Sequence, residues 1–173
     1  MLDRMLIRAY GLFWSADEVE WFPGAGNRGR YMLLGRQGKQ SPKLRLADFR
    51  TQSGLYILYG NYGPYYVGKA DRMGQRLKQH LNDRHAGKWS RFSWFGFKPV
   101  LTSRDAVGLS RLKELPAKSR GPMDKQIGEL EALLIRALGL ENNYAKMRFP
   151  GAGPWEQVRL DDVETYLAKV ARR

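Results

Sequence analysis

The sequence predicts an α+β domain built on a small sheet, and three observations lead to this fold class. The segment GLYILYGNYGPYYVG, residues 54–68, contains two strand-like runs joined by a short turn, and strands joined so closely must be antiparallel. The elements along the chain run strand, strand, helix, strand, helix, helix, an order that favours an α+β fold. The hydrophobic fraction of 43% and the five tryptophans indicate a folded chain with a core.

The first fifty residues are expected to form a short β appendage. Residues 6–14 and 30–36 are rich in aromatic and branched side chains, which is typical of strands. Residues 22–30 and 35–45 are rich in glycine and basic side chains, which is typical of loops.

Beyond the hairpin, the apolar pattern predicts helices separated by one more strand. Met73, Leu77 and Leu81 recur at a spacing of four, which predicts a helix over 71–85. The remaining expected elements are a strand at 89–100, helices at 105–115, 124–139 and 160–173, and a loop at 148–155. The expected division is an N-terminal extension at 1–50, a main domain at 51–147, and a closing loop and helix at 148–173.

Composition narrows the function classes. Thirty lysines and arginines against seventeen acidic residues give a net charge of +13, which indicates a polyanionic partner such as nucleic acid. The absence of cysteine excludes thiol catalysis and cysteine-based zinc sites, and with two histidines any metal is expected to be a hard cation such as Mg²⁺ on carboxylate. The sequence contains no apolar run of about 18 residues, so no membrane span is expected. Charged residues near the N-terminus argue against a secretory signal. A cytoplasmic location is therefore expected.

The hairpin contains two tyrosines whose relative position depends on the strand register. If Gly60 pairs with Pro64, Tyr56 faces Gly68, and Tyr56 and Tyr66 are diagonal neighbours on one face. A shift of one residue places the two phenols on opposite faces. The residues alone leave both registers open, and also the interpretation that these are ordinary strand tyrosines.

Three further polar side chains stand at positions of interest on expected helices. Glu131 falls on the apolar stripe of helix 124–139, where a carboxylate is costly unless it is paired or binds a metal. Arg76 and His80 are four residues apart and share one helix face. The alternatives are a border glutamate that reaches water, a solvated arginine and a half-packed histidine.

Taken together, these residues resemble the motif set of the GIY-YIG nuclease family. The two name-giving triplets correspond to Gly54-Leu55-Tyr56 and Tyr66-Val67-Gly68. The match then continues through Lys69, Arg76, His80, Glu131 within Leu-Glu-Ala-Leu-Leu-Ile, and Asn143.

The resemblance implies a three-stranded, largely antiparallel sheet flanked by helices, in the register that places both phenols on one face. It implies an endonuclease that hydrolyses DNA with a single metal, Mg²⁺ or Mn²⁺, held by Glu131. Tyr56, assisted by His80, would take a proton from the attacking water, and Arg76 would neutralise charge on the phosphate. Tyr66 and Lys69 would orient or polarise the reacting groups. Asn143 would brace the site.

Basic side chains around this motif set are expected to contact the phosphates of a nucleic acid, with double-stranded DNA as the expected partner. The candidates are Arg28, Arg30, Lys39, Lys43, Arg72, Lys78, Arg84 and Lys88. The aromatic side chains of 91–97 are expected to be sheet core rather than stacking platforms for bases. Two other functions stay open: a nucleic-acid-binding module that does not cut, and a ribonuclease. The oligomeric state is not predicted.

Overall fold

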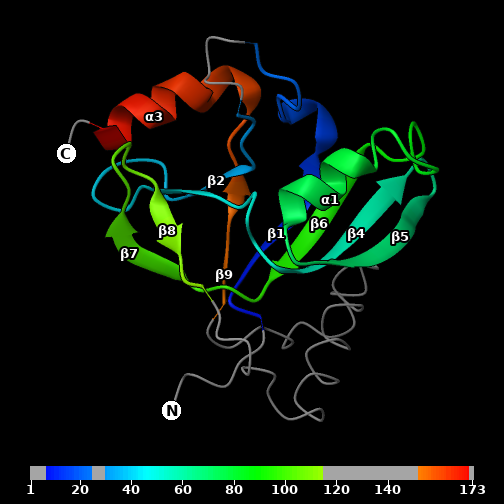
Figure 1. The fold of residues 1–173 in the computed structure, drawn as a ribbon. Helices are drawn as coiled ribbons and strands as arrows, with labels where there is room; N and C mark the ends of the chain where they lie inside the picture. Colours follow the sequence, from blue (N-terminus) through cyan, green and yellow to red (C-terminus); the bar gives the residue numbers. More distant parts are fainter. Residues whose placement is uncertain (1–6, 25–29, 115–151, 172–173) are drawn as a thin grey trace, which may run out of the picture.

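The computed structural model describes residues 7–24, 30–114 and 152–171. Their elements follow one another as a mixture of short strands and helices (Figure 1). The strands are β1 (Ala9–Ser15), β2 (Leu34–Gln37), β3 (Arg45–Asp48), β4 (Gly54–Gly60), β5 (Gly63–Ala70), β6 (Arg91–Gly96), β7 (Val100–Arg104), β8 (Ser110–Leu112), β9 (Gly153–Pro154) and β10 (Glu156–Gln157). The helices are α1 (Met73–Gln79) and α3 (Val163–Ala171), with short 3-10 helices at Ala16–Glu18 and Leu160–Asp162.

The α+β class is confirmed, but the main sheet is larger than the three strands expected. Within the described ranges it has five strands in the order β5-β4-β6-β1-β9. Strand β1, from the segment expected to be an appendage, pairs antiparallel with β6 and parallel with β9. The sheet therefore incorporates β1 and β9, with β6 between them and the hairpin that carries the tyrosines (Figure 1).

The expected helix at 105–115 is wrong: this segment turns and returns as β8, which pairs with β7. The Asp105 carboxylate accepts the backbone N–H groups of Val107 and Leu109. Gly108 adopts a φ of 90°, in the left-handed region that a right-handed helix does not contain. A side-chain turn followed by a glycine turn thus replaces the helix that the apolar spacing suggested.

The expected helix at 71–85 exists but is shorter, and α1 ends at Gln79. Past it, Leu81 and Asn82 donate backbone hydrogen bonds only three residues back, which is the geometry of tightening turns. The Asp83 side chain then accepts the N–H of His85, and this competes with continued helix. The expected helix at 160–173 is confirmed over Val163–Ala171 (α3), which follows a 3-10 turn at Leu160–Asp162, and the helix expected at 124–139 lies outside the described residues.

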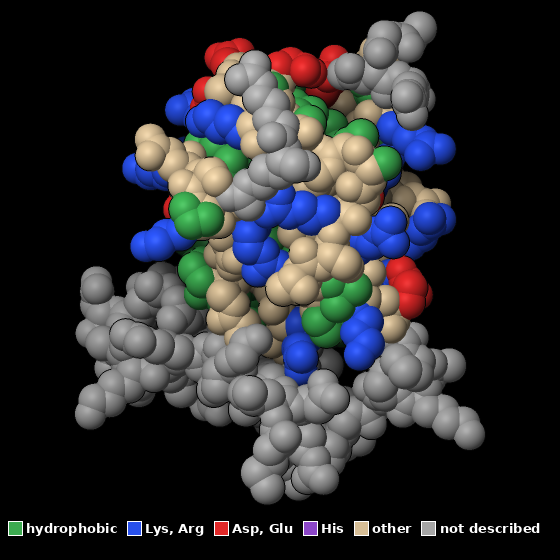
Figure 2. Space-filling model, turned by 90° about the vertical axis from the view of Figure 1, so that its left-hand side faces the viewer, with side chains coloured by type: hydrophobic (Ala, Val, Ile, Leu, Met, Phe, Trp, Pro, Cys, Tyr) green, Lys and Arg blue, Asp and Glu red, His purple; other side chains and the backbone are tan. Residues whose placement is uncertain are grey.

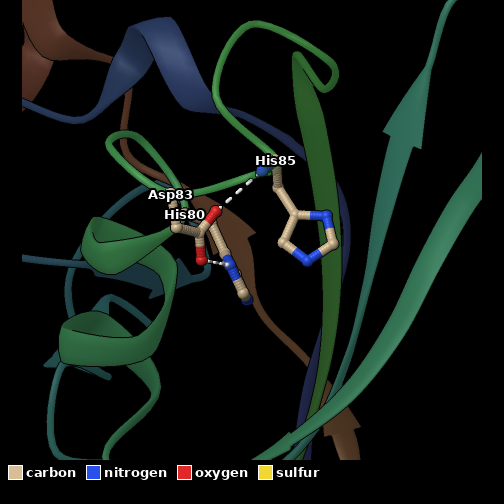
Figure 3. Close-up of side chains that lie close together, drawn as sticks. All are labelled: His80, Asp83 and His85. Carbon is tan, nitrogen blue, oxygen red and sulfur yellow. Dashed lines mark hydrogen bonds and ion pairs between the residues drawn. The ribbon is translucent and has the colours of Figure 1, made fainter.

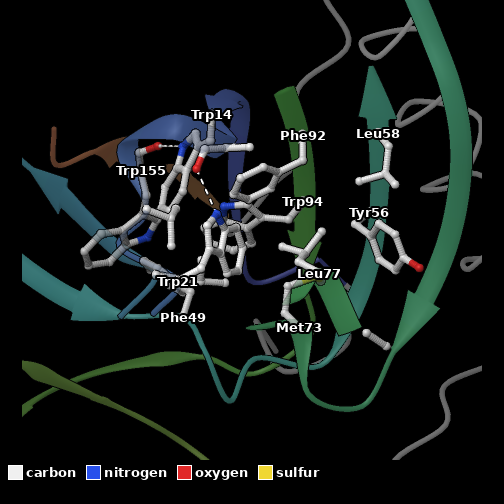
Figure 4. Packing of buried hydrophobic residues seen from close by; sticks show 14 of the residues in the cluster. Trp14, Trp21, Phe49, Tyr56, Leu58, Met73, Leu77, Phe92, Trp94 and Trp155 are labelled. Atoms are coloured by element: carbon white, nitrogen blue, oxygen red, sulfur yellow. Dashed lines mark hydrogen bonds between the residues drawn. The ribbon is translucent and has the colours of Figure 1, made fainter. Parts of the chain in front are cut away.

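The main core lies on one face of the five-stranded sheet and reaches from the side chains of α1 to Phe49 and Trp155 (Figure 4). Phe92 and Trp94 of β6 are fully buried there, with Met73 and Leu77 of α1 packed against the same cluster. This confirms that the aromatic side chains of β6 belong to the sheet core. Burial of each such side chain contributes roughly 1.5–3 kcal/mol, so this packing fixes α1 over the sheet.

A second, smaller sheet packs against α3. Strands β10, β2 and β3 form a three-stranded antiparallel sheet. Its apolar side chains pack with α3 through Leu34, Leu46, Val158 and Val170. None of the helices in the described part of the chain is long and apolar enough to cross a membrane.

Candidate active site

The β4–β5 hairpin brings two tyrosines together on the face that α1 covers. Tyr56 pairs with Gly68 and Leu58 pairs with Tyr66, as expected for the register that joins the phenols. The register shifts beyond Leu58, so that Tyr59 pairs with Pro64 rather than Gly60. The two phenol rings lie 6.0 Å apart between centroids. The prediction that they share one face is confirmed.

Gly68 makes room for the Tyr56 ring. A Cβ atom built on Gly68 would overlap the hydroxyl end of the Tyr56 ring, which is fully buried. Any side chain at this position would therefore push the phenol away from its neighbours. This contact explains the glycine of the second triplet without reference to backbone conformation.

Helix α1 delivers the next two groups. Leu77 and Met73 face the core, which directs Arg76 to the exposed side of the helix while keeping it beside the sheet. His80 caps the helix C-terminus and is fully buried. Its Nε2 lies 2.7 Å from the hydroxyl of Tyr56, and its ring packs edge-on against Tyr66 at 5.6 Å.

The loop after α1 completes the group with Asp83 and His85 (Figure 3). Oδ2 of Asp83 lies 2.7 Å from Nδ1 of His80, and its Oδ1 accepts the backbone N–H of His85 at 2.8 Å. The His85 ring packs edge-on against His80, and its Nδ1 lies 3.1 Å from the hydroxyl of Tyr65. The result is a chain of hydrogen bonds from Tyr56 through His80 to Asp83.

The electrostatics of this chain keep the phenol and the imidazole neutral at pH 7. Burial raises the pKa of Tyr56 to about 12, and hydrogen bonding to Arg76 offsets part of that rise. Burial lowers the pKa of His80, while the hydrogen bond and charge of Asp83 act in the opposite direction. Hydrogen bonding to Tyr56, and to a smaller extent to Tyr66, raises the pKa of Arg76. A neutral imidazole beside a phenol and a fixed cation is suited to accept a proton near an anionic substrate.

The comparison with protein families is consistent with this geometry. The model of the GIY-YIG catalytic domain matches residues 52–145, which is more than half of the chain. The chain belongs to the GIY-YIG family. No curated protein sequence and no solved structure matches it. GIY-YIG domains are in general nucleases that depend on a divalent metal, so nucleic acid is the substrate class that membership implies.

Several residues of the GIY-YIG motif set cannot be placed. Glu131 and Asn143 lie outside the described residues, and so does the side chain of Lys69. The backbone of Lys69 pairs with Leu55 in the hairpin. The roles of these three residues stay predictions.

Among the described residues, His80, Asp83 and His85 could offer metal-ligand atoms, all within 4.8 Å of one another. Both nitrogens of His80 are already engaged, and Nε2 of His85 accepts a hydrogen bond from Arg84 at 3.2 Å. Mg²⁺ prefers oxygen ligands and several waters. This group therefore does not fit a GIY-YIG magnesium site, whereas a carboxylate such as that of Glu131 has suitable chemistry.

The predicted phosphate-contacting residues are partly gathered in one place. Arg30 and Arg72 line the same open pocket of about 440 Å³, together with Arg50 and Tyr31. Lys78 lies over the rings of Phe22 and Tyr31, each at 4.6 Å. Four other predicted phosphate-contacting residues are exposed and do not line this pocket: Lys39, Lys43, Arg84 and Lys88. Arg28 lies outside the described residues.

Sequence reasoning missed Asp83, His85 and Arg50. Asp83 follows His80 by three residues, a spacing that places two side chains on neighbouring surface of a helix or turn. The Asn-Asp pair at 82–83 is also typical of a turn. Arg50 precedes the matched segment, and only the fold places it beside α1.

Proposed function

We propose that this GIY-YIG domain is a metal-dependent endonuclease that hydrolyses phosphodiester bonds of double-stranded DNA. The observation that carries the proposal is the 2.7 Å hydrogen bond between the buried hydroxyl of Tyr56 and Nε2 of His80. The guanidinium of Arg76 is near enough to the same phenol to act against the rise in its pKa. A proton acceptor, a proton relay and a fixed cation stand together, as hydrolysis of a phosphodiester requires.

The proton path begins at the attacking water. Because the pKa of Tyr56 is about 12, the phenolate is too scarce at pH 7 to serve as the base by itself. Tyr56 instead accepts the water proton on its oxygen while its own hydroxyl proton passes to Nε2 of His80. The hydroxide so formed bonds to phosphorus, the opposite P–O bond breaks, and the leaving oxygen finally takes a proton from solvent.

The side chains around the scissile phosphate have separate roles. Arg76 neutralises negative charge that builds up on the non-bridging oxygens. Tyr66, whose ring lies beside both Tyr56 and His80, orients the water. Glu131 would hold Mg²⁺ or Mn²⁺, which when bound supplies Lewis-acid stabilisation of the leaving oxygen.

The substrate assignment rests on charge and shape. The net charge of +13 favours a polyanion. The pocket lined by Arg30, Arg50 and Arg72 opens at the N-terminal end of α1, one turn of helix from Arg76. Such a pocket would receive the phosphate backbone that flanks the scissile bond.

The test is cleavage of supercoiled plasmid in Mg²⁺ by the full chain and two variants, Arg76→Ala and Glu131→Ala. Loss of one charge-stabilising group costs about 10²–10³ in rate, so both variants should lose cutting while retaining DNA binding. Arg111→Ala, which removes an exposed arginine of β8, is the matched control and should cut normally.

Three results would contradict the proposal. Wild-type cutting by Glu131→Ala would remove the metal assignment. Cleavage of RNA but not DNA in parallel reactions would change the substrate. If the wild-type chain binds DNA tightly but does not cleave it in Mg²⁺ or Mn²⁺, the protein is a DNA-binding module and not a nuclease.

A further inference from the structure

We propose that Asp83 is a positioning residue of this site, because its carboxylate holds His80 in the one tautomer that can receive the Tyr56 proton. Asp83 lies in the loop after α1, and its carboxylate bonds Nδ1 of His80, whereas the hydroxyl of Tyr56 bonds the other ring nitrogen. The catalytic consequence rests on the proposed function, whereas the tautomer itself is a property of the free protein.

The tautomer follows from the two ends of the imidazole. An ionised carboxylate can only accept hydrogen bonds. Oδ2 of Asp83 lies 2.7 Å from Nδ1 of His80, so the proton of a neutral ring must reside on Nδ1. Nε2 then carries a lone pair and accepts from the hydroxyl of Tyr56, also at 2.7 Å. The opposite tautomer would place an N–H at Nε2 and close the proton path.

Asp83 is itself held in place and ionised. Its second oxygen, Oδ1, accepts the backbone N–H of His85 at 2.8 Å, which fixes the orientation of the carboxylate (Figure 3). Partial burial acts to raise the pKa of Asp83, but the hydrogen bonds from His85 and His80 outweigh it, and the pKa is lowered. The turn that ends α1 early thus also presents the carboxylate to His80.

The groups that face His80 come from every element packed around it. Tyr56 approaches from β4, Tyr66 from β5 and Arg76 from α1, and the loop contributes Asp83 and His85. Arg76 and His85 lower the pKa of His80, and among the residues that the structure describes Asp83 is the one charged neighbour that raises it. Removal of Asp83 therefore lowers the pKa of His80 as well as freeing its tautomer.

A metal bound between His80, Asp83 and His85 is the competing interpretation of the same cluster. It would need to displace at least one of the two 2.7 Å hydrogen bonds of His80. It would also lie beside the guanidinium of Arg84, whose Nε donates to His85. The relay leaves each of these contacts as it stands, so we favour it over the metal.

The experiment compares the full chain with Asp83→Asn. An asparagine amide can donate to Nδ1 of His80 and so favour the Nε2–H tautomer. Nitrogen-15 NMR of histidine-labelled protein reads the tautomer directly. The chain has two histidines, and His85→Gln assigns the two signals.

We expect Nδ1–H at His80 in the wild type and Nε2–H in Asp83→Asn. Plasmid cleavage by the variant should fall at least about 100-fold, within the range that general-base catalysis contributes. The acid limb of its residual pH–rate profile should move to lower pH. Asp17→Asn, an exposed residue with the same charge change, should alter neither signal nor rate.

An Nε2–H tautomer in the wild type overturns the inference whatever the activity. So does an unchanged tautomer in Asp83→Asn, or a cleavage rate within threefold of wild type with an unmoved profile. Stoichiometric Zn²⁺ binding to both imidazoles, lost in Asp83→Asn, would replace the relay by the metal site. If the tautomers behave as expected but the wild type cuts no nucleic acid, the positioning role of Asp83 is supported and the proposed function alone fails.

Discussion

Two buried side chains, Tyr56 and His80, define the site at the scale of single residues. Each is fully buried, yet each is hydrogen-bonded to the other, which removes the cost of burying a polar group alone. The same burial makes the phenol a weak acid and the imidazole a weak base. In the proposed mechanism, the hydrogen bond between them lets the phenol pass its own proton to the imidazole as it accepts one from water.

Tyr56→Phe tests this dependence. The variant keeps the ring and its packing but removes the oxygen that relays the proton, so the cleavage rate should fall by about 10²–10⁴-fold. The free energy of unfolding should fall by about 1–3 kcal/mol because Nε2 of His80 is left buried and unpaired. Single-turnover cleavage and urea denaturation measure the two effects.

Tyr59→Phe is the matched control for Tyr56→Phe. The Tyr59 hydroxyl is also buried and donates to Ser93, but Tyr59 belongs to the apolar cluster on the opposite face of the sheet. It should lose comparable stability and keep its cleavage rate. Equal cleavage by the two variants would move the proton relay away from Tyr56.

The resemblance to the GIY-YIG motif set assigned Tyr56, Tyr66, Arg76 and His80 to the site, whereas the strand and helix periods alone left their roles open. The hairpin register then determines which phenols meet, and it was confirmed. Asp83 was not predicted because its role depends on where α1 stops. The helical pattern continued past that point, and a local side-chain hydrogen bond ended the helix.

At the scale of elements, the contact between β4 and β6 fixes the site to the core. The two strands pair from Gly54 with Gly96 to Tyr59 with Arg91. The hairpin was predictable from its turn residues, whereas the pairing of β1 with β6 was not, because nothing local in a sequence specifies which distant strands meet. The helix expected at 105–115 is wrong for a local reason. The apolar spacing of this segment suits a helix, but Asp105 and Gly108 impose a turn.

Gly54→Ala tests the β4–β6 contact. A Cβ atom on Gly54 would overlap the backbone carbonyl oxygen of Phe95 in β6, and no change of rotamer can relieve a clash with backbone. The strands must separate locally, so the free energy of unfolding should fall by about 1–3 kcal/mol. Gly24→Ala, where a Cβ atom meets open space, is the control. Midpoints of urea denaturation that agree for the two variants would show that the sheet absorbs the clash without cost.

At the scale of the whole molecule, charge alone does not locate the binding surface. Lysine and arginine side chains also spread over the side of the molecule away from the β4–β5 hairpin (Figure 2). Several basic side chains have structural partners instead: Lys98 bonds Glu114, and Arg36 pairs with Glu156. What distinguishes the pocket at α1 is that arginines from separate segments converge there, at the N-terminal end of the helix.

The salt dependence of DNA binding tests whether this pocket contacts phosphates. Each phosphate contact that is lost should reduce the slope of log affinity against log salt by about 1, so the double variant Arg30→Ala, Arg72→Ala should reduce it by about 2. The control is Arg111→Ala, Lys113→Ala, which removes the same charge from exposed positions on and beside β8. Fluorescence anisotropy with a labelled duplex between low and moderate salt gives both slopes.

If the two double variants have equal slopes, the arginines act through net charge, and the phosphate-binding role of the pocket is excluded. If only the pocket variant loses slope, and the loss is about 2 rather than 1, both arginines contact phosphate. The segment before residue 52 then takes part in holding the substrate, because Arg30 precedes the matched domain and Arg72 lies within it.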